Sequence, residues 1–135
     1  KQYQVKKICD ENNIDFFAYS PLSFGILCID PDKEQNKEKS FIRNALFENY
    51  KKPTYELRRC LKRIANQRSV SQAQVAINWC CYQGTIPLVG MRKKSQVIDV
   101  SNVFNWNLKK NEFKVLQEVS KKCLKKMPKN PFSSN

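Results

Sequence analysis

Two short apolar stretches, 15–20 and 85–89, are the segments of this chain with the composition of β-strands. Apolar residues recur at helical spacing between them, which predicts helices that carry the chain from one strand to the next. A strand, a helical crossover and a second strand pair in parallel. Because two strands alone leave both edges of a sheet open, the pattern predicts part of a larger α/β fold.

Helical patterns fill most of the remaining sequence. A short helix is expected to end near Glu11, and a long loop, 21–39, follows the first strand, with a charged middle expected to be the most mobile part. Ser40 is a candidate cap for the next helix. Pro53 suits the first turn of a further helix, whose apolar stripe is Leu57, Cys60, Leu61, Ile64 and Ala65.

The segment 71–84 carries the clearest helix signals. Ser71 and Gln74 have the spacing of a capping box, and Gly84 is placed to end the helix. The expected buried stripe is Ala73, Ala76, Ile77, Cys80 and Cys81. A helix from about Ser95 to Phe104 follows, and the last of five or six helices turns these residues inward: Phe113, Leu116, Val119 and Cys123. Residues 128–135 read as a loose tail.

The residue types narrow the function classes. With no histidine, Ser–His and Cys–His nucleophile pairs are excluded within this chain. With only three glycines, the glycine-rich P-loop motif of nucleoside triphosphatases and the Rossmann fingerprint are excluded as well. The six cysteines lack C-x-x-C spacing, so no metal site is expected and the thiols are read as reduced, as in a cytoplasmic protein. No apolar run could span a membrane. The chain begins with Lys1 and no signal segment, so we expect a piece of a longer protein.

A formal charge of +13 permits polyanion binding. The cations are mostly lysines scattered along polar helix faces, which does not favour a general nucleic-acid-binding protein. They gather at one notable place, "IPLVGMRKKSQV", where a strand ends at Gly90 and Arg92, Lys93 and Lys94 precede a helix. Cations beside a helix N-terminus can form an anion site. The residues alone leave this reading open beside that of a solvated basic loop.

Four segments, in order, resemble motifs of the aldo-keto reductases. "FFAYSPLSFGIL" is similar to the family's A-[WY]-S-P-L-x-x-G-x-L, and "SVSQAQVAINWCCYQGTIPLVG" resembles its helix and final barrel strand. "MRKKSQVIDV" resembles the cofactor loop and "FNWNLKKNEFKVL" the last helix. The resemblance implies an α/β fold, namely the C-terminal fragment of a (β/α)8 TIM barrel. Residues 1–127 would form its last two β/α units and C-terminal helix.

The family binds NADP(H) in extended form. The resemblance implies cofactor-binding roles for the end of the first strand and the loop that follows it, residues 19–25. Tyr19 matches the aromatic residue that stacks on the nicotinamide, although a tyrosine at a strand end can also belong to the core. The loop that wraps the pyrophosphate is matched by Ser20, Pro21, Leu22 and Gly25.

The second loop matches the adenosine end of the cofactor. Gly90 matches the turn after the last strand, and Arg92, with Lys93 next to it, matches the family's position beside the 2′-phosphate. Gln96 matches a position that packs on the adenine or its ribose, and Asp99 one near the adenine.

The chain also departs from the family pattern. Val100 stands where the family often has Asn, and Lys109 replaces the usual cap of the last helix, which predicts a frayed start. The family's catalytic Asp, Tyr, Lys and His lie on strands absent from this chain, so no catalytic residue is assigned. Trp79 matches a family tryptophan that we interpret as core.

These matches imply the cofactor-binding portion of an NADPH-dependent reductase of aldehydes or ketones. Its partners would be the missing N-terminal part of the barrel and, in the complete enzyme, the carbonyl substrate. Self-association through the open strand edges is also expected. Two rivals stay open: a non-catalytic remnant acting as an interaction module, and a basic nucleic-acid-binding protein.

Overall fold

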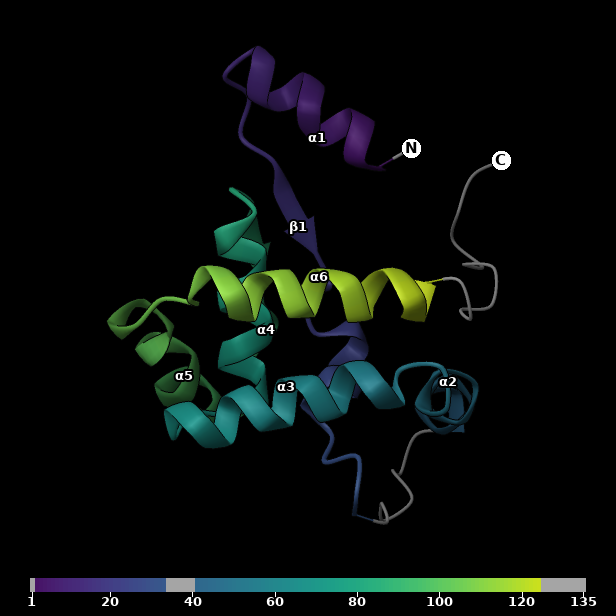
Figure 1. Cartoon of the computed structure of the whole chain (residues 1–135). Coiled ribbons are helices and arrows are strands. Elements are labelled where there is room, and N and C mark those ends of the chain that lie inside the picture. The colour runs from purple at the N-terminus through teal and green to yellow at the C-terminus, as the bar shows by residue number, and fades with distance from the viewer. Residues whose placement is uncertain (1, 34–40, 125–135) are drawn as a thin grey trace.

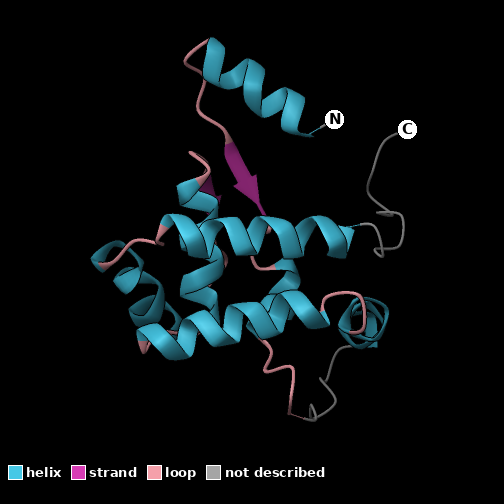
Figure 2. Ribbon diagram, viewed as in Figure 1, coloured by secondary structure: helices cyan, strands magenta, loops and turns pink. Residues whose placement is uncertain are grey.

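The computed structural model describes residues 2–33 and 41–124. Figure 1 labels its α-helices and the first strand, and Figure 2 colours the elements by type. The full order is α1 (Gln2–Glu11), β1 (Phe17–Tyr19), the 3-10 helix η1 (Ser23–Cys28), α2 (Phe41–Lys51), α3 (Tyr55–Arg68), α4 (Gln72–Tyr82), β2 (Ile86–Leu88), α5 (Lys94–Ser101), the 3-10 helix η2 (Asn102–Asn105) and α6 (Lys110–Leu124). The expected α/β class, with two strands and about six helices, is confirmed for this part of the chain. The Ser40 cap, the charged loop middle at 34–39 and the tail at 128–135 lie outside the described residues.

The two strands are parallel neighbours, as the sequence predicts. Phe17 lies opposite Ile86, and Tyr19 opposite Leu88. These four side chains share one face of the sheet and are exposed, whereas the middle residues of both strands are partly buried. Each strand is three residues long, shorter than predicted, since only these residues find partners in a ladder of two strands.

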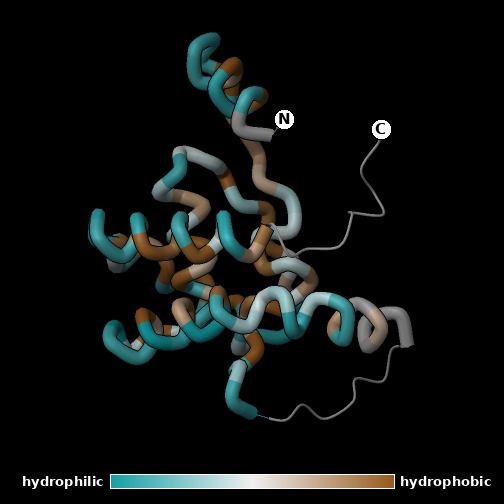
Figure 3. The backbone as a smooth tube through the Cα atoms, turned by 45° about the vertical axis from the view of Figure 1, so that its right-hand side comes forward, coloured by the Kyte–Doolittle hydropathy of each residue, from teal (hydrophilic) through white to brown (hydrophobic). Residues whose placement is uncertain are grey.

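The core lies between α3, α4 and α6. α3 packs against both other helices, and Figure 1 shows α4 crossing α3 and α6. The predicted apolar stripe of α3 is buried in full. Leu61, Val75 and Leu116, one from each helix, are 0% exposed. Figure 3 shows hydrophobic stretches on the inner turns of the helices and hydrophilic ones outside. Trp79 packs against this core, as interpreted from the sequence.

The predicted buried stripe of α4 is partly wrong. Ala76 and Ile77 are buried, but Ala73, Cys80 and Cys81 are only partly so. Gln74, Val75 and Asn78 are buried instead. Periodicity missed the two amides because polar residues are normally assigned to the surface, and these two are buried with hydrogen-bond partners from later in the chain.

The capping box at the start of α4 is half formed. Ser71 Oγ accepts a hydrogen bond from the Gln74 N–H at 3.1 Å, as predicted. The Gln74 side chain, however, turns away from the Ser71 backbone and bonds to Asp99 and Trp106. Gly84 follows the helix with φ of +69°, so its predicted role as a stop is confirmed.

Three other boundaries differ from the sequence expectation. η1 forms within the predicted loop, and the predicted helix 95–104 is divided into α5 and η2. Pro53 lies just before the N-cap residue Thr54 rather than in the first turn of α3. At the start of α6, Glu112 accepts a hydrogen bond from the Lys109 N–H at 2.7 Å. This bond supplies a partner that the fraying prediction overlooked.

Candidate functional site

The parallel pairing brings two loops that are distant in sequence to the same end of the sheet, where both strands finish. Tyr19 and Leu88, the last residues of β1 and β2, lie opposite each other. The segments that follow them, 20–28 and 89–93, therefore both begin at the carboxyl end of the sheet. In α/β folds this is where ligands are usually bound.

The loop after β1 is tightly wound. Its backbone is left-handed at Ser20 (φ 52°), Ser23 (47°), Phe24 (57°) and Gly25 (91°). Only the glycine adopts such angles at no steric cost. Strained backbone of this kind is concentrated at functional sites, where the surrounding structure holds it in place.

Several contacts hold this loop. The Ser23 N–H donates to the Ser20 carbonyl and the Gly25 N–H to the Leu22 carbonyl, both at 2.9 Å. Leu27, two residues beyond Gly25, is buried in the core, and Gln72 Nε2 donates to its carbonyl at 3.1 Å. The first turn of α4 thereby fixes the far end of the loop.

Tyr19 is 81% exposed at the end of β1. It therefore does not belong to the core of this chain, and that interpretation of its sequence position is wrong. The exposed ring is available to stack on a flat group above the strand end.

The loop after β2 is ordered by one side chain. Gln96, in the first turn of α5, accepts hydrogen bonds at Oε1 from the backbone N–H groups of Arg92 (2.8 Å) and Lys93 (3.0 Å). All residues from Gly90 to Ile98 are exposed. The cationic side chains of Arg92, Lys93 and Lys94 therefore stand in solvent beside the N-terminus of α5.

Asp99 is the predicted site residue whose surroundings were least expected. Its Oδ2 accepts a hydrogen bond from the Ser71 hydroxyl at 2.6 Å, and its Oδ1 accepts one from Gln74 Nε2 at 2.7 Å. Gln74 Oε1 in turn accepts from Trp106 Nε1 at 3.1 Å. The carboxylate thus links α5 to the beginning of α4.

Sequence reasoning assigned Ser71 and Gln74 to helix capping alone. It missed that both also support the loop region through Asp99. The available signal was an amide among apolar residues at a buried helix position, because such an amide needs a partner elsewhere in the fold.

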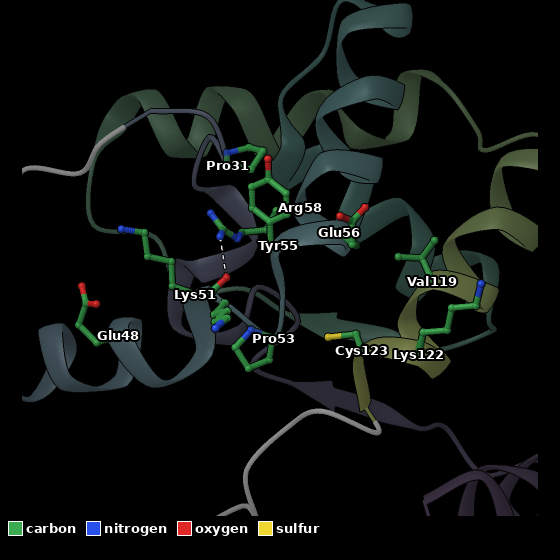
Figure 4. A pocket seen from close by; sticks show the side chains of 11 residues that line it. Pro31, Glu48, Lys51, Pro53, Tyr55, Glu56, Arg58, Val119, Lys122 and Cys123 are labelled. Carbon is green, nitrogen blue, oxygen red and sulfur yellow. Dashed lines mark hydrogen bonds between the residues drawn. The ribbon is translucent and has the colours of Figure 1, made fainter.

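A cavity of about 840 Å³ lies between α2, α3 and α6 (Figure 4) and is lined by none of the predicted cofactor residues. Arg58, 1% exposed, borders it. The guanidinium donates to the Lys51 carbonyl at 2.7 Å and to Thr54 Oγ1 at 3.3 Å. Burial lowers the pKa of Arg58. These bonds tie the end of α2 to the start of α3.

Two further kinds of site were sought in residues 2–33 and 41–124. No cluster there of three or more Cys, Asp or Glu side chains could hold a metal ion. No helix in these ranges has the length and apolarity needed to cross a bilayer. Cys9, Cys60, Cys80 and Cys81 are free thiols, and burial raises the pKa of Cys80 to about 11.

Comparison with known proteins decides the family. The sequence model of the Aldo/keto reductase family matches residues 1–121. The chain belongs to the aldo/keto reductase family. The resemblance inferred from four short motifs is thereby confirmed.

Among curated relatives of this aldo/keto reductase chain, a chloroplastic pyridoxal reductase of Arabidopsis thaliana is 33% identical over 134 residues, covering 99% of this chain and 36% of the relative. Rhazimal reductase 2 of Alstonia scholaris is 28% identical over 120 residues, covering 88% of this chain and 30% of the relative. The chain therefore spans about a third of the length of these relatives.

The same architecture is present in a solved structure. A glycerol dehydrogenase from Gluconobacter oxydans matches 98% of the aldo/keto reductase chain and 42% of its own, with a TM-score of 0.70 and 24% identity. At this identity the match supports the fold alone. It agrees with the predicted barrel fragment.

Proposed function

We propose that the chain is the C-terminal, cofactor-binding portion of an NADPH-dependent aldo/keto reductase that reduces aldehydes or ketones. Family membership supports an oxidoreductase, and the two relatives above are reductases by name. The chain corresponds to about a third of such proteins, and the remainder, including the catalytic residues, would come from the N-terminal part of the barrel.

One observation carries the proposal. The loops after β1 and β2 lie at the same carboxyl end of the sheet, and exposed cations lie beside the N-terminus of a helix at that end. The helix N-terminus and the cations both favour a phosphate. Arg92 can fork two phosphate oxygens with its planar guanidinium, which a lysine cannot.

The residues present fit NADP(H) at both ends. Arg92 and Lys93 would hold the 2′-phosphate, and the loop 20–25 would wrap the pyrophosphate. The exposed ring of Tyr19 would stack on the nicotinamide. Bound NADPH would supply the hydride, while this part of the protein would orient the cofactor. The proton donor would belong to the N-terminal part.

Cofactor selectivity tests the proposal. Arg92→Ala should weaken NADPH binding about tenfold or more and NADH binding little, since only NADPH carries the 2′-phosphate and a charge-assisted hydrogen bond is worth about 1.5–3 kcal/mol. Titration of both cofactors onto the complete wild-type enzyme and onto its Arg92→Ala variant measures the effect. Lys114→Ala, which removes an exposed cation from α6, is the matched control. Equal losses for both cofactors would contradict the proposal.

A further part of the proposal concerns partners and location. The open edges of the two-stranded sheet support self-association of the isolated chain, and four apolar side chains are exposed on one face of the same sheet. The free thiols of Cys9, Cys60, Cys80 and Cys81 support a reducing compartment, and we propose the cytoplasm. The Arabidopsis relative, by its name, is chloroplastic, so fractionation of the parent protein is the appropriate test.

A further inference from the structure

We infer that Asp99 is a positioning residue, which holds α5 and thereby the phosphate loop 90–93 through Ser71 and Gln74, rather than a direct contact of the cofactor's adenine. The inference rests on the proposed function, because it concerns how the same site is ordered. It differs from the role that the family resemblance implies for Asp99.

The first step is the way α5 is attached. No residue of this helix is buried, so little apolar surface holds it to the core. Its C-terminal end is fixed by Val103 in η2, which is 2% exposed. Its remaining polar attachment to α4 is the Asp99 carboxylate, with bonds of 2.6 and 2.7 Å to Ser71 and Gln74.

The second step is the rigidity of the acceptor's partners. Gln74 is 5% exposed, and its amide is held at both ends, by Asp99 and by the indole of Trp106. The Ser71 hydroxyl donates to Asp99 while its oxygen accepts from the Gln74 N–H. Each polar atom in this network has a defined partner, and such networks specify a single arrangement.

The third step connects Asp99 to the phosphate loop. Gln96 precedes Asp99 by three residues, so the two side chains lie on neighbouring turns of one helix face. Gln96 holds the N–H groups of Arg92 and Lys93. Fixing α5 at Asp99 therefore fixes the backbone from which the two cations project. Without that attachment, the loop would have to be ordered when the phosphate binds, at a cost in affinity.

The two roles predict different cofactor dependence. Asp99→Ala should weaken NADPH binding about three- to tenfold and NADH binding little, because disorder of loop 90–93 affects the 2′-phosphate end. A direct adenine contact would be lost equally for both cofactors, since both contain adenine. Gln74→Met, at a buried position on α4, should reproduce the NADPH-selective loss, and the double variant should lose little more.

A second measurement does not require cofactor. Hydrogen exchange at the backbone N–H groups of Arg92 and Lys93 should become faster in both variants of the 135-residue chain, and Asp99→Asn, which retains one acceptor, should be intermediate. Thermal unfolding of each variant separates this local effect from global loss of structure. Unchanged exchange, or equal loss of both cofactors with Asp99→Ala beside normal binding with Gln74→Met, would overturn the inference.

Failure of the proposed function would look different. In that case Arg92→Ala would leave the preference for NADPH over NADH unchanged, whatever the exchange data show for the loop.

Discussion

Arg68 and Glu112 are joined by two parallel hydrogen bonds, from Nε to Oε1 at 3.0 Å and from Nη2 to Oε2 at 2.7 Å. The pair links the last turn of α3 to the first turn of α6. The Arg68 guanidinium also lies 5.4 Å from the ring centre of Trp106. Fork-shaped pairing of this kind restricts orientation as well as distance.

The pair should make stability depend on pH. Burial alone would raise the pKa of Glu112, but the hydrogen bonds from Arg68 and the Lys109 N–H outweigh it and lower the pKa below the ordinary 4.5. A lowered pKa means stabilisation that is present above the pKa of the unfolded chain and lost as the pH falls through the folded value. Glu112→Gln should therefore reduce the free energy of unfolding by about 1–2 kcal/mol at pH 7 and by much less near pH 3. Urea unfolding at both pH values is the measurement, and Glu118→Gln, at an exposed position of α6, is the control. A loss independent of pH would contradict the assignment.

The buried amide of Asn78 should be among the most sensitive positions to substitution. Its Nδ2 donates to the carbonyls of Val103 (3.2 Å) and Trp106 (2.8 Å), and its Oδ1 accepts from the Leu108 N–H at 3.0 Å. Asn78→Ala should cost about 2–4 kcal/mol, because these backbone groups would lose their partner. Asn66→Ala, at an exposed position of α3, should change stability by less than about 0.5 kcal/mol.

Asn78→Asp refines that test. The carboxylate could still accept from the Leu108 N–H, but its second oxygen would face two carbonyl oxygens. We therefore expect it to destabilise the fold as well. Thermal unfolding of the variant and the wild type measures the effect. An unchanged unfolding temperature for Asn78→Asp would show that the two hydrogen bonds donated by Asn78 contribute little to stability.

The isolated chain should not reduce carbonyls. The role proposed for Tyr19 is stacking rather than proton donation, and the residues expected to donate the proton belong to the N-terminal part of the barrel. Purified residues 1–135 should oxidise NADPH with a panel of aldehydes no faster than buffer does. Turnover above that background, surviving in Tyr19→Phe, would reveal a catalytic acid that neither the motifs nor the geometry identified.

Self-association should use the edge of β1 rather than that of β2. The Ile86 N–H donates to the Phe16 carbonyl, so by the alternation of a parallel ladder the backbone groups of Phe17 and Tyr19 face away from β2. On the other edge, the outward position is Pro87, which has no N–H to donate.

Phe17→Pro should therefore lower the fraction of dimer, because it removes an outward donor and leaves the ladder between β1 and β2 intact. Ala18→Pro removes an inward donor instead and should destabilise the fold. Sedimentation velocity over a concentration series measures the first effect. A wild-type chain that stays monomeric, or a Phe17→Pro variant that dimerises normally, would refute the use of this edge.

The parts of the fold that follow from local pattern were predictable. The α3 stripe, the parallel strands and the Gly84 stop rest on spacing, crossover direction and a left-handed turn, all of which are visible in one stretch of sequence. The site residues on the two loops were predicted from family motifs, and the structure places both loops at the same carboxyl end of the sheet. Their contact with cofactor stays a prediction.

The polar network could not be predicted in the same way. Gln74 and Asp99 are separated by 25 residues, and nothing in the spacing of either helix indicates that they meet. Periodicity assigns an amide to the surface, whereas in this chain two amides are buried because distant backbone and side-chain groups satisfy them. Such pairings depend on the packing of whole helices.

The pairing of Phe17 with Ile86 also has a consequence for how the molecule reaches its folded state. α3 and α4 are neighbours in sequence and can associate early, but the strand ladder must close a loop that contains both of them, which costs entropy before any bond forms. The carboxyl end of the sheet, where the two loops meet, should therefore form late in folding. A ligand that contacts both loops would bind only the finished fold and would raise its population by mass action. The rate at which binding capacity appears during refolding would thus follow the closure of the ladder, whereas the helical signal would appear earlier.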